Sequence, residues 1–140
     1  MQTTVNTLRQ QIEPFVREEL GCRCPDEVFC DIRVVEKPAA FEGLPVDYAL
    51  AIGGRLLVVV CLPERWRDVS RQLRELVHQG RQVRDQGGYN RFRLIVPTVE
   101  RGAACQELET RFSVLAGADQ RGHLHIVAPV VLPSIPGAGV

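Results

Sequence analysis

The sequence predicts a single-domain, three-layer α/β fold with a mixed central sheet, in the order helix, three strands, helix, strand, helix, strand. Short apolar runs of strand length alternate with longer segments of helical periodicity. The 140 residues suffice to bury one core, and 45% hydrophobic with 24% charged residues is typical of a globular domain. We expect the domain to cover residues 1–128. Residues 129–140, rich in proline and glycine and uncharged, predict an extended or disordered tail.

The first predicted elements are a helix and a strand. Apolar residues recur at helical spacing from Val5 to Leu20, and Pro14 within this stretch predicts a kink or two short helices. Residues 28–35 are rich in β-branched side chains, which favours a first strand begun by a helical turn at Pro25.

A hairpin is predicted next. Residues 46–52 and 55–62 are apolar runs separated by Gly53-Gly54, a pair that suits a tight turn. The second run is apolar on both faces from Leu56 to Val60, which predicts a strand in the middle of the sheet.

The second half of the chain alternates helices with strands. Its longest helix is expected over residues 64–86, closed by Gly87-Gly88. The remaining elements are a strand, a helix and a strand, over residues 92–96, 103–116 and 123–127.

Composition places few limits on function. The 17 basic residues balance the 17 acidic ones, and all basic residues except Lys37 are arginine, a bias that a GC-rich genome explains as well as function does. The N-terminus lacks a signal-peptide pattern, and no apolar run approaches the ~20 residues that span a bilayer. The odd number of cysteines, five, predicts reduced thiols rather than a disulfide framework. We therefore expect a cytoplasmic protein with no membrane partner.

Two motifs and the element order carry a resemblance to a known superfamily. Pro45-Val46-Asp47-Tyr48 places an aspartate at the start of the second strand, and Gly53-Gly54-Arg55 precedes an apolar third strand. In these features residues 5–97 resemble the core of the PD-(D/E)xK, or restriction-endonuclease-like, superfamily. The resemblance implies a metal-binding role for Asp47 and an acidic residue and a lysine on the third strand.

The third strand departs from that pattern. It reads Val58-Val59-Val60-Cys61 where the acidic residue and the lysine should stand. A single carboxylate does not supply the oxygen ligands that Mg²⁺ requires, so we expect nuclease chemistry to be lost and Asp47 to be structural. The leading hypothesis is a non-catalytic α/β binding or accessory protein, a degenerate nuclease-like domain.

A cysteine cluster supports a second hypothesis. Cys22, Cys24 and Cys30 fall within nine positions, and thiolates bind zinc and iron–sulfur centres. His123 and His125, two apart on one strand face, are further candidate ligands. The same cysteines suit thiol redox chemistry, and inert buried thiols remain an equally weighted alternative.

A third hypothesis is nucleic-acid binding through the arginine-rich helix. Residues 63–93 carry eight arginines against four acidic residues. A salt-bridged, solvated helix face explains the same pattern. The partner stays open among nucleic acid, another protein and a second copy of the chain. The candidate binding residues are Arg67, Arg71, Arg74, Arg81, Arg84 and Arg91.

Overall fold

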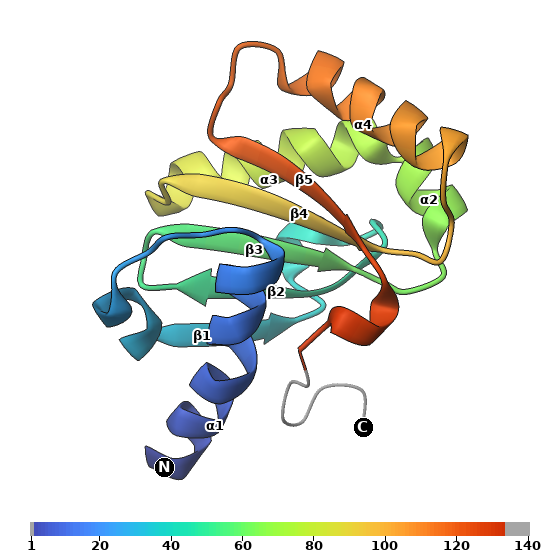
Figure 1. Ribbon diagram of the computed structural model, residues 1–140. Helices are drawn as coiled ribbons and strands as arrows, with labels where there is room; N and C mark the ends of the chain where they lie inside the picture. Colours follow the sequence, from blue (N-terminus) through green and yellow to red (C-terminus); the bar gives the residue numbers. More distant parts are fainter. Residues whose placement is uncertain (1, 134–140) are drawn as a thin grey trace.

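The computed structural model describes residues 2–133 and has a five-stranded mixed sheet between two layers of helices (Figure 1). The three-layer α/β prediction is confirmed. The strands follow one another across the sheet in sequence order, with β1–β2 and β2–β3 antiparallel and β3–β4 and β4–β5 parallel. Their bounds are β1 Ile32–Glu36, β2 Val46–Ile52, β3 Leu56–Cys61, β4 Arg91–Pro97 and β5 Gly122–Val127.

Four helices cover the sheet. One face is packed by α1 and the turns that follow it, and the opposite face is packed by the other three helices (Figure 1). None of the helices within residues 2–133 is long and apolar enough to cross a membrane. The helices are α1 Gln2–Pro14, α2 Trp66–Arg71, α3 Leu73–Gly87 and α4 Ala103–Ala116.

Proline ends the first helix and glycine forms the β2–β3 hairpin turn, at the positions that the sequence predicted. The helix α1 ends at Pro14 and continues as a π-helical turn over Phe15–Glu19, which confirms the predicted interruption. Gly53 and Gly54 have φ of +60° and +65°, the left-handed values that a tight hairpin turn between β2 and β3 requires.

The predicted first strand and the predicted longest helix have different bounds in the structure. The helical turn predicted after Pro25 is present as the 3₁₀ turn Asp26–Cys30. It includes Val28 and Phe29, which were predicted as strand residues and are buried in the core, so β1 begins only at Ile32. The predicted helix over residues 64–86 starts at Trp66 and divides at Gln72, whose side chain donates a hydrogen bond to the Gly43 carbonyl at 3.1 Å.

The predicted tail also begins with structure. Pro129–Val131 forms a 3₁₀ turn, and Val131 and Leu132 pack against the core beneath α1. Residues 134–140 lie outside the described part of the chain.

The two faces of the sheet differ at β4 and β5. On the face of α2–α4, both strands contribute apolar side chains to the core. On the face of α1, the apolar positions of β2 and β3 give way to Arg93 on β4 and to His123 and His125 on β5. The candidate site lies at this polar part of an otherwise apolar face.

Candidate functional site

A pocket of about 470 Å³ lies where β3, β4 and β5 begin. Four separate segments form it: the chain that follows the π-helical turn, the end of the β2–β3 hairpin, the start of β4 and the start of β5. We refer to it as the arginine pocket. Its lining residues are Gly21, Cys22, Arg23, Cys24, Pro25, Val28, Arg55, Leu56, Asn90, Arg91, Arg93 and His123.

Hydrogen bonds to backbone carbonyls hold the pocket segments in place. The amide of Cys22 donates to the Val16 carbonyl at 3.1 Å, and the amide of Asn90 donates to the Arg55 carbonyl at 2.7 Å. Arg93 Nη1 donates to the Leu20 carbonyl at 3.2 Å, so β4 is also tied to the chain that precedes the cysteines. The pocket wall is thus fixed by the fold.

Two arginine–histidine pairs stand side by side on β4 and β5. Nη1 of Arg91 lies 3.0 Å from Nε2 of His123, and Nη1 of Arg93 lies 2.8 Å from Nε2 of His125. A guanidinium nitrogen only donates, so both Nε2 atoms accept and both imidazoles are neutral in these pairs. Burial lowers the pKa of His123 and, helped by Arg93, lowers the pKa of His125 to about 4.

Arg93 carries a charge without a counterion. Its relative exposure is 9%, and its Nε is buried without a hydrogen-bond partner within the described chain. Burial and the nearby charge of Arg91 lower the pKa of Arg93. Buried charges are costly unless they are paired, so this guanidinium is unusual.

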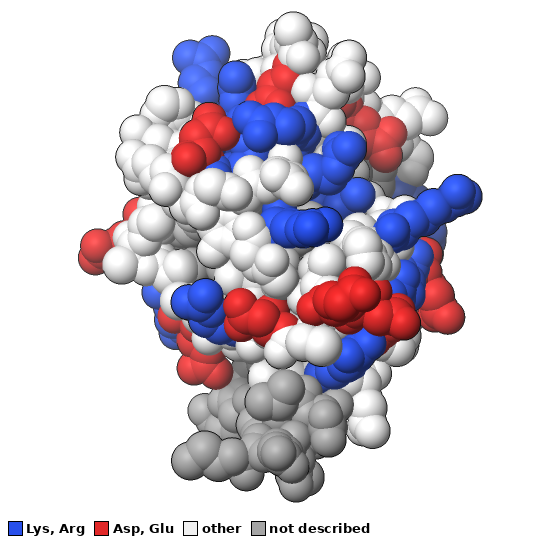
Figure 2. All heavy atoms as spheres, turned by 90° about the vertical axis from the view of Figure 1, so that its left-hand side faces the viewer, with Lys and Arg blue, Asp and Glu red and all other residues white. Residues whose placement is uncertain are grey.

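Among the described residues, four arginines and no acidic residue line the arginine pocket. Within residues 2–133, none of Arg23, Arg55, Arg91 and Arg93 forms an ion pair with a carboxylate. Figure 2 shows the side of the molecule on which β3, β4 and β5 begin. Basic side chains gather over the centre and upper part of this side, and acidic side chains lie mainly around them. The pocket therefore has a positive potential suited to anions.

The predicted cysteine cluster takes another form. Cys22 and Cys24 are joined by a disulfide bond, with Cα atoms 5.6 Å apart, so the prediction of reduced thiols is wrong at these positions. An odd cysteine count does not exclude one pair formed between near neighbours. Cys30 is exposed, and its sulfur accepts a hydrogen bond from Arg9 at 3.6 Å.

The predicted zinc or iron–sulfur site is consequently not assembled. Sulfurs shared in a disulfide are not thiolate ligands, and His123 and His125 are already engaged by arginines. Across residues 2–133, no three His, Cys, Asp or Glu side chains are grouped so as to hold a metal ion.

The arginine-rich helix is largely neutralised by its neighbours. Arg84 is buried and donates to Asp119 at 2.7 Å, and Arg81 pairs with the same carboxylate at 3.2 Å. Arg71 pairs with Asp68 at 2.7 Å. The predicted residues thus do not form one basic face. Of the remaining candidates, Arg67 and Arg74 are exposed, and Arg91 belongs to the arginine pocket.

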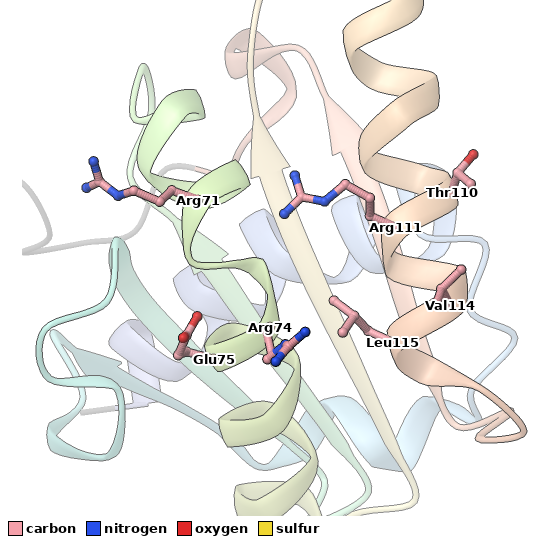
Figure 3. A pocket seen from close by; sticks show the side chains of 7 residues that line it. All are labelled: Arg71, Arg74, Glu75, Thr110, Arg111, Val114 and Leu115. Atoms are coloured by element: carbon pink, nitrogen blue, oxygen red, sulfur yellow. The ribbon is translucent and has the colours of Figure 1, made fainter.

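A second hollow, of about 490 Å³, lies between α2–α3 and α4 (Figure 3). Arg111 reaches from α4 to donate to the Ser70 Oγ at 2.8 Å and to the Ser70 carbonyl at 2.6 Å. In Figure 3, Arg71 points away from α4. This hollow is less suited to an anion than the arginine pocket, because Arg111 donates its hydrogen bonds to Ser70 and the carboxylate of Glu75 also lines the hollow.

Asp47 stands apart from both hollows. It is half-buried on β2, at the register shift between Val46 and Tyr48, and its carbonyl accepts from the Lys37 amide at 2.9 Å. The residues on either side of Asp47, Val46 and Tyr48, pair with Cys61 and Val60 of β3.

Sequence reasoning missed most of the arginine pocket. It did not single out Arg23 or Arg55 as site residues, whereas the arginine-dense segment 84–93, which contains Arg93, was a candidate recognition surface. A signal was present: Arg91 and Arg93 alternate on one strand just as His123 and His125 do on another, which predicts one shared polar face if the strands are neighbours.

Comparison with known proteins identifies no relative. No family model, curated protein or solved structure matches the chain.

Proposed function

We propose that this protein binds an anionic small molecule in the arginine pocket. The observation that carries the proposal is Arg93, which is buried in a pocket lined by three further arginines and no carboxylate. A bound anion would supply the missing counter-charge for the buried guanidinium. The proposal keeps the expectation of a binding or accessory protein. Its site is the arginine pocket, where β3, β4 and β5 begin, and not the arginine-rich helix of the nucleic-acid hypothesis.

The shape and chemistry of the pocket favour a ligand with phosphate or carboxylate groups. Guanidinium groups form paired hydrogen bonds with such oxyanions, and Asn90 adds an amide. A volume of about 470 Å³ falls in the range of small-molecule sites. Each charge-assisted hydrogen bond contributes about 1.5–3 kcal/mol, so the loss of one arginine weakens binding about tenfold or more.

Calorimetric titration with pyrophosphate and with citrate, at constant ionic strength, tests this proposal. We expect binding of at least one of them to the wild type and about tenfold weaker binding to Arg55→Gln and Arg91→Gln. Both side chains are exposed, so both variants should fold. Arg67→Gln, an exposed arginine outside the pocket, is the matched control and should bind as the wild type does.

Other outcomes point elsewhere. Equal affinity in all three variants contradicts the arginine pocket as the binding site. Salt-sensitive binding of single-stranded DNA that is weakened by Arg67→Gln and not by Arg91→Gln would return the function to the exposed arginines of the helix.

We also infer that the domain is a degenerate relative of restriction-endonuclease-like proteins. The support is the order of one helix, three strands, a helix and a strand, with Asp47 on the second strand and valines on the third. We expect no Mg²⁺-dependent cleavage of DNA or RNA. Cleavage by the wild type that disappears in Asp47→Ala would overturn this inference.

A further inference from the structure

The Cys22–Cys24 disulfide forms part of the wall of the arginine pocket. Both cysteines are partly exposed and line the pocket together with Arg23, Arg55 and Arg91, and they also pack against the core on the α1 side of the sheet. A disulfide placed beside guanidinium groups that form no ion pair with a carboxylate within residues 2–133 is an electrophile in a site that attracts anions. This placement does not follow from the anion-binding role, which would need no sulfur.

We propose that the pocket binds a small thiol that carries carboxylates and exchanges it with the Cys22–Cys24 disulfide. This inference rests on the proposed anion-binding function and names the class of ligand and its reaction. The arginines hold the carboxylates and so bring the ligand thiolate to the sulfurs. The buried Arg93, whose Nε has no hydrogen-bond partner within residues 2–133, carries the anion-binding function, and the disulfide in the same pocket is what this inference adds.

The reaction balances without another reagent. A ligand thiolate attacks one cysteine sulfur, a ligand–protein disulfide forms, and the Cys22–Cys24 bond breaks with its electron pair leaving on the other cysteine as a thiolate. A second ligand thiolate attacks the ligand sulfur of the mixed disulfide. The oxidised ligand dimer leaves, and both protein sulfurs are thiolates. Two ligand thiolates have lost one electron each, and the protein disulfide has gained two.

The arginines act on both halves of this reaction. Thiolate attack depends on access and on the local concentration of the anionic nucleophile, which a positive pocket increases. Positive neighbours also stabilise the thiolate that leaves, because cations lower the free energy of a nearby negative charge. With no acidic residue lining the pocket, nothing in its lining opposes either effect.

Three small thiols that differ in charge test the proposal: mercaptosuccinate with two carboxylates, neutral 2-mercaptoethanol, and cationic cysteamine. Each is added at equal thiolate concentration, and the rates are corrected for the basicity of each thiol. Alkylation followed by mass spectrometry counts reduced Cys22 and Cys24 and detects the mixed disulfide. We expect mercaptosuccinate to react about tenfold faster than 2-mercaptoethanol, and cysteamine to react slowest.

Two variants show whether the pocket causes this preference. Arg55→Gln and Arg91→Gln should bring the mercaptosuccinate rate down toward that of 2-mercaptoethanol. They should lower the 2-mercaptoethanol rate to a smaller extent, because only the stabilisation of the leaving thiolate is weakened for a neutral thiol. Arg67→Gln should retain the full preference. Pyrophosphate should compete with mercaptosuccinate and not with the neutral thiol, if it binds the same arginines.

The results separate this inference from the function on which it rests. Equal corrected rates for the three thiols overturn the inference that the pocket selects a carboxylate-bearing thiol, and pyrophosphate or citrate binding to the same protein then leaves anion binding intact. Equal rates without anion binding overturn both. A preference for mercaptosuccinate that survives in Arg55→Gln and Arg91→Gln also overturns the inference, because its selectivity would arise outside the arginine pocket.

Discussion

Nη1 of Arg93 and Nε2 of His125 lie 2.8 Å apart across neighbouring parallel strands, which joins a buried cation to a neutral imidazole. The pair requires the Nε2 lone pair, so protonation of His125 converts an acceptor into a second cation beside Arg93. This explains in part why the pKa of His125 falls to about 4, with burial as the larger cause.

The first prediction is a loss of stability in acid. Because the folded state lowers the pKa of His125 from 6.5 to about 4, its contribution is complete above pH 6.5 and is lost as the pH falls toward 4. Urea unfolding at pH 7 and pH 4 should show that the wild type loses roughly 3 kcal/mol more than His125→Gln, which does not titrate there.

A matched control accompanies that measurement. His78→Gln, at an exposed position on α3, should lose as much stability in acid as the wild type. If His125→Gln loses as much as the wild type as well, His125 is not held neutral in the folded protein.

The second prediction concerns the contact between α3 and β4. A Cβ atom on Gly80 would overlap Cζ of Phe92, a fully buried ring. We expect Gly80→Ala to lower the free energy of unfolding by about 1–3 kcal/mol, although alanine favours the helix by about 1 kcal/mol. Gln82→Ala, an exposed change on the same helix, should alter it by no more than about 0.5 kcal/mol.

A double variant distinguishes this cause from others. Phe92→Leu reduces the bulk that opposes residue 80, so Gly80→Ala should cost less in that background than in the wild type. Additive effects of the two changes would contradict a direct clash.

Most of the fold follows from the sequence because periodicity and turn chemistry agree. The helix over residues 103–116 was predicted with its observed bounds, and Gly53-Gly54 identified the hairpin turn. Local sequence patterns predicted the wrong secondary structure where tertiary contacts determine it. Val28 and Phe29 read as strand residues, yet their burial beneath α1 favours a turn.

The site was predictable only in parts, since its members come from segments far apart in the chain. Arg55 and Asn90 meet through a backbone hydrogen bond between a hairpin and the start of β4, a contact that no local pattern encodes. The ion pairs of the arginine-rich helix agree with the salt-bridged alternative, but their partners could not be predicted for a related reason. Arg81 and Arg84 find their counter-charge in Asp119, which is remote in sequence.

The third prediction concerns that buried ion pair. Arg84 and Asp119 have side-chain exposures of 3% and 10% and lie 2.7 Å apart. Arg84→Met would leave the carboxylate with less compensation in a poorly solvated place, so we expect a loss of about 3 kcal/mol or more in urea unfolding. Arg71→Met removes an exposed pair with Asp68 and should cost no more than about 1 kcal/mol. Similar losses in both variants would show that Arg84 is not effectively buried.

The final prediction tests the state of the cysteines. Cys30, Cys61 and Cys105 are free, and Cys61 is fully buried, which raises the pKa of its thiol to about 12. A thiol reagent applied to native, unreduced protein should modify Cys30 and Cys105 and leave Cys61 unmodified, because the reagent needs an accessible thiolate. Unfolding without reductant should expose Cys61 and bring the total to three reactive thiols.

Reduction before unfolding should raise the total to five, the full number of cysteines. Peptide mapping then assigns the additional thiols, which must be the pair that lines the arginine pocket. Five reactive thiols in unfolded protein that has never met a reductant would mean that Cys22 and Cys24 are not joined. The exchange reaction would then lose its electrophile, whereas the four arginines would still form an anion site.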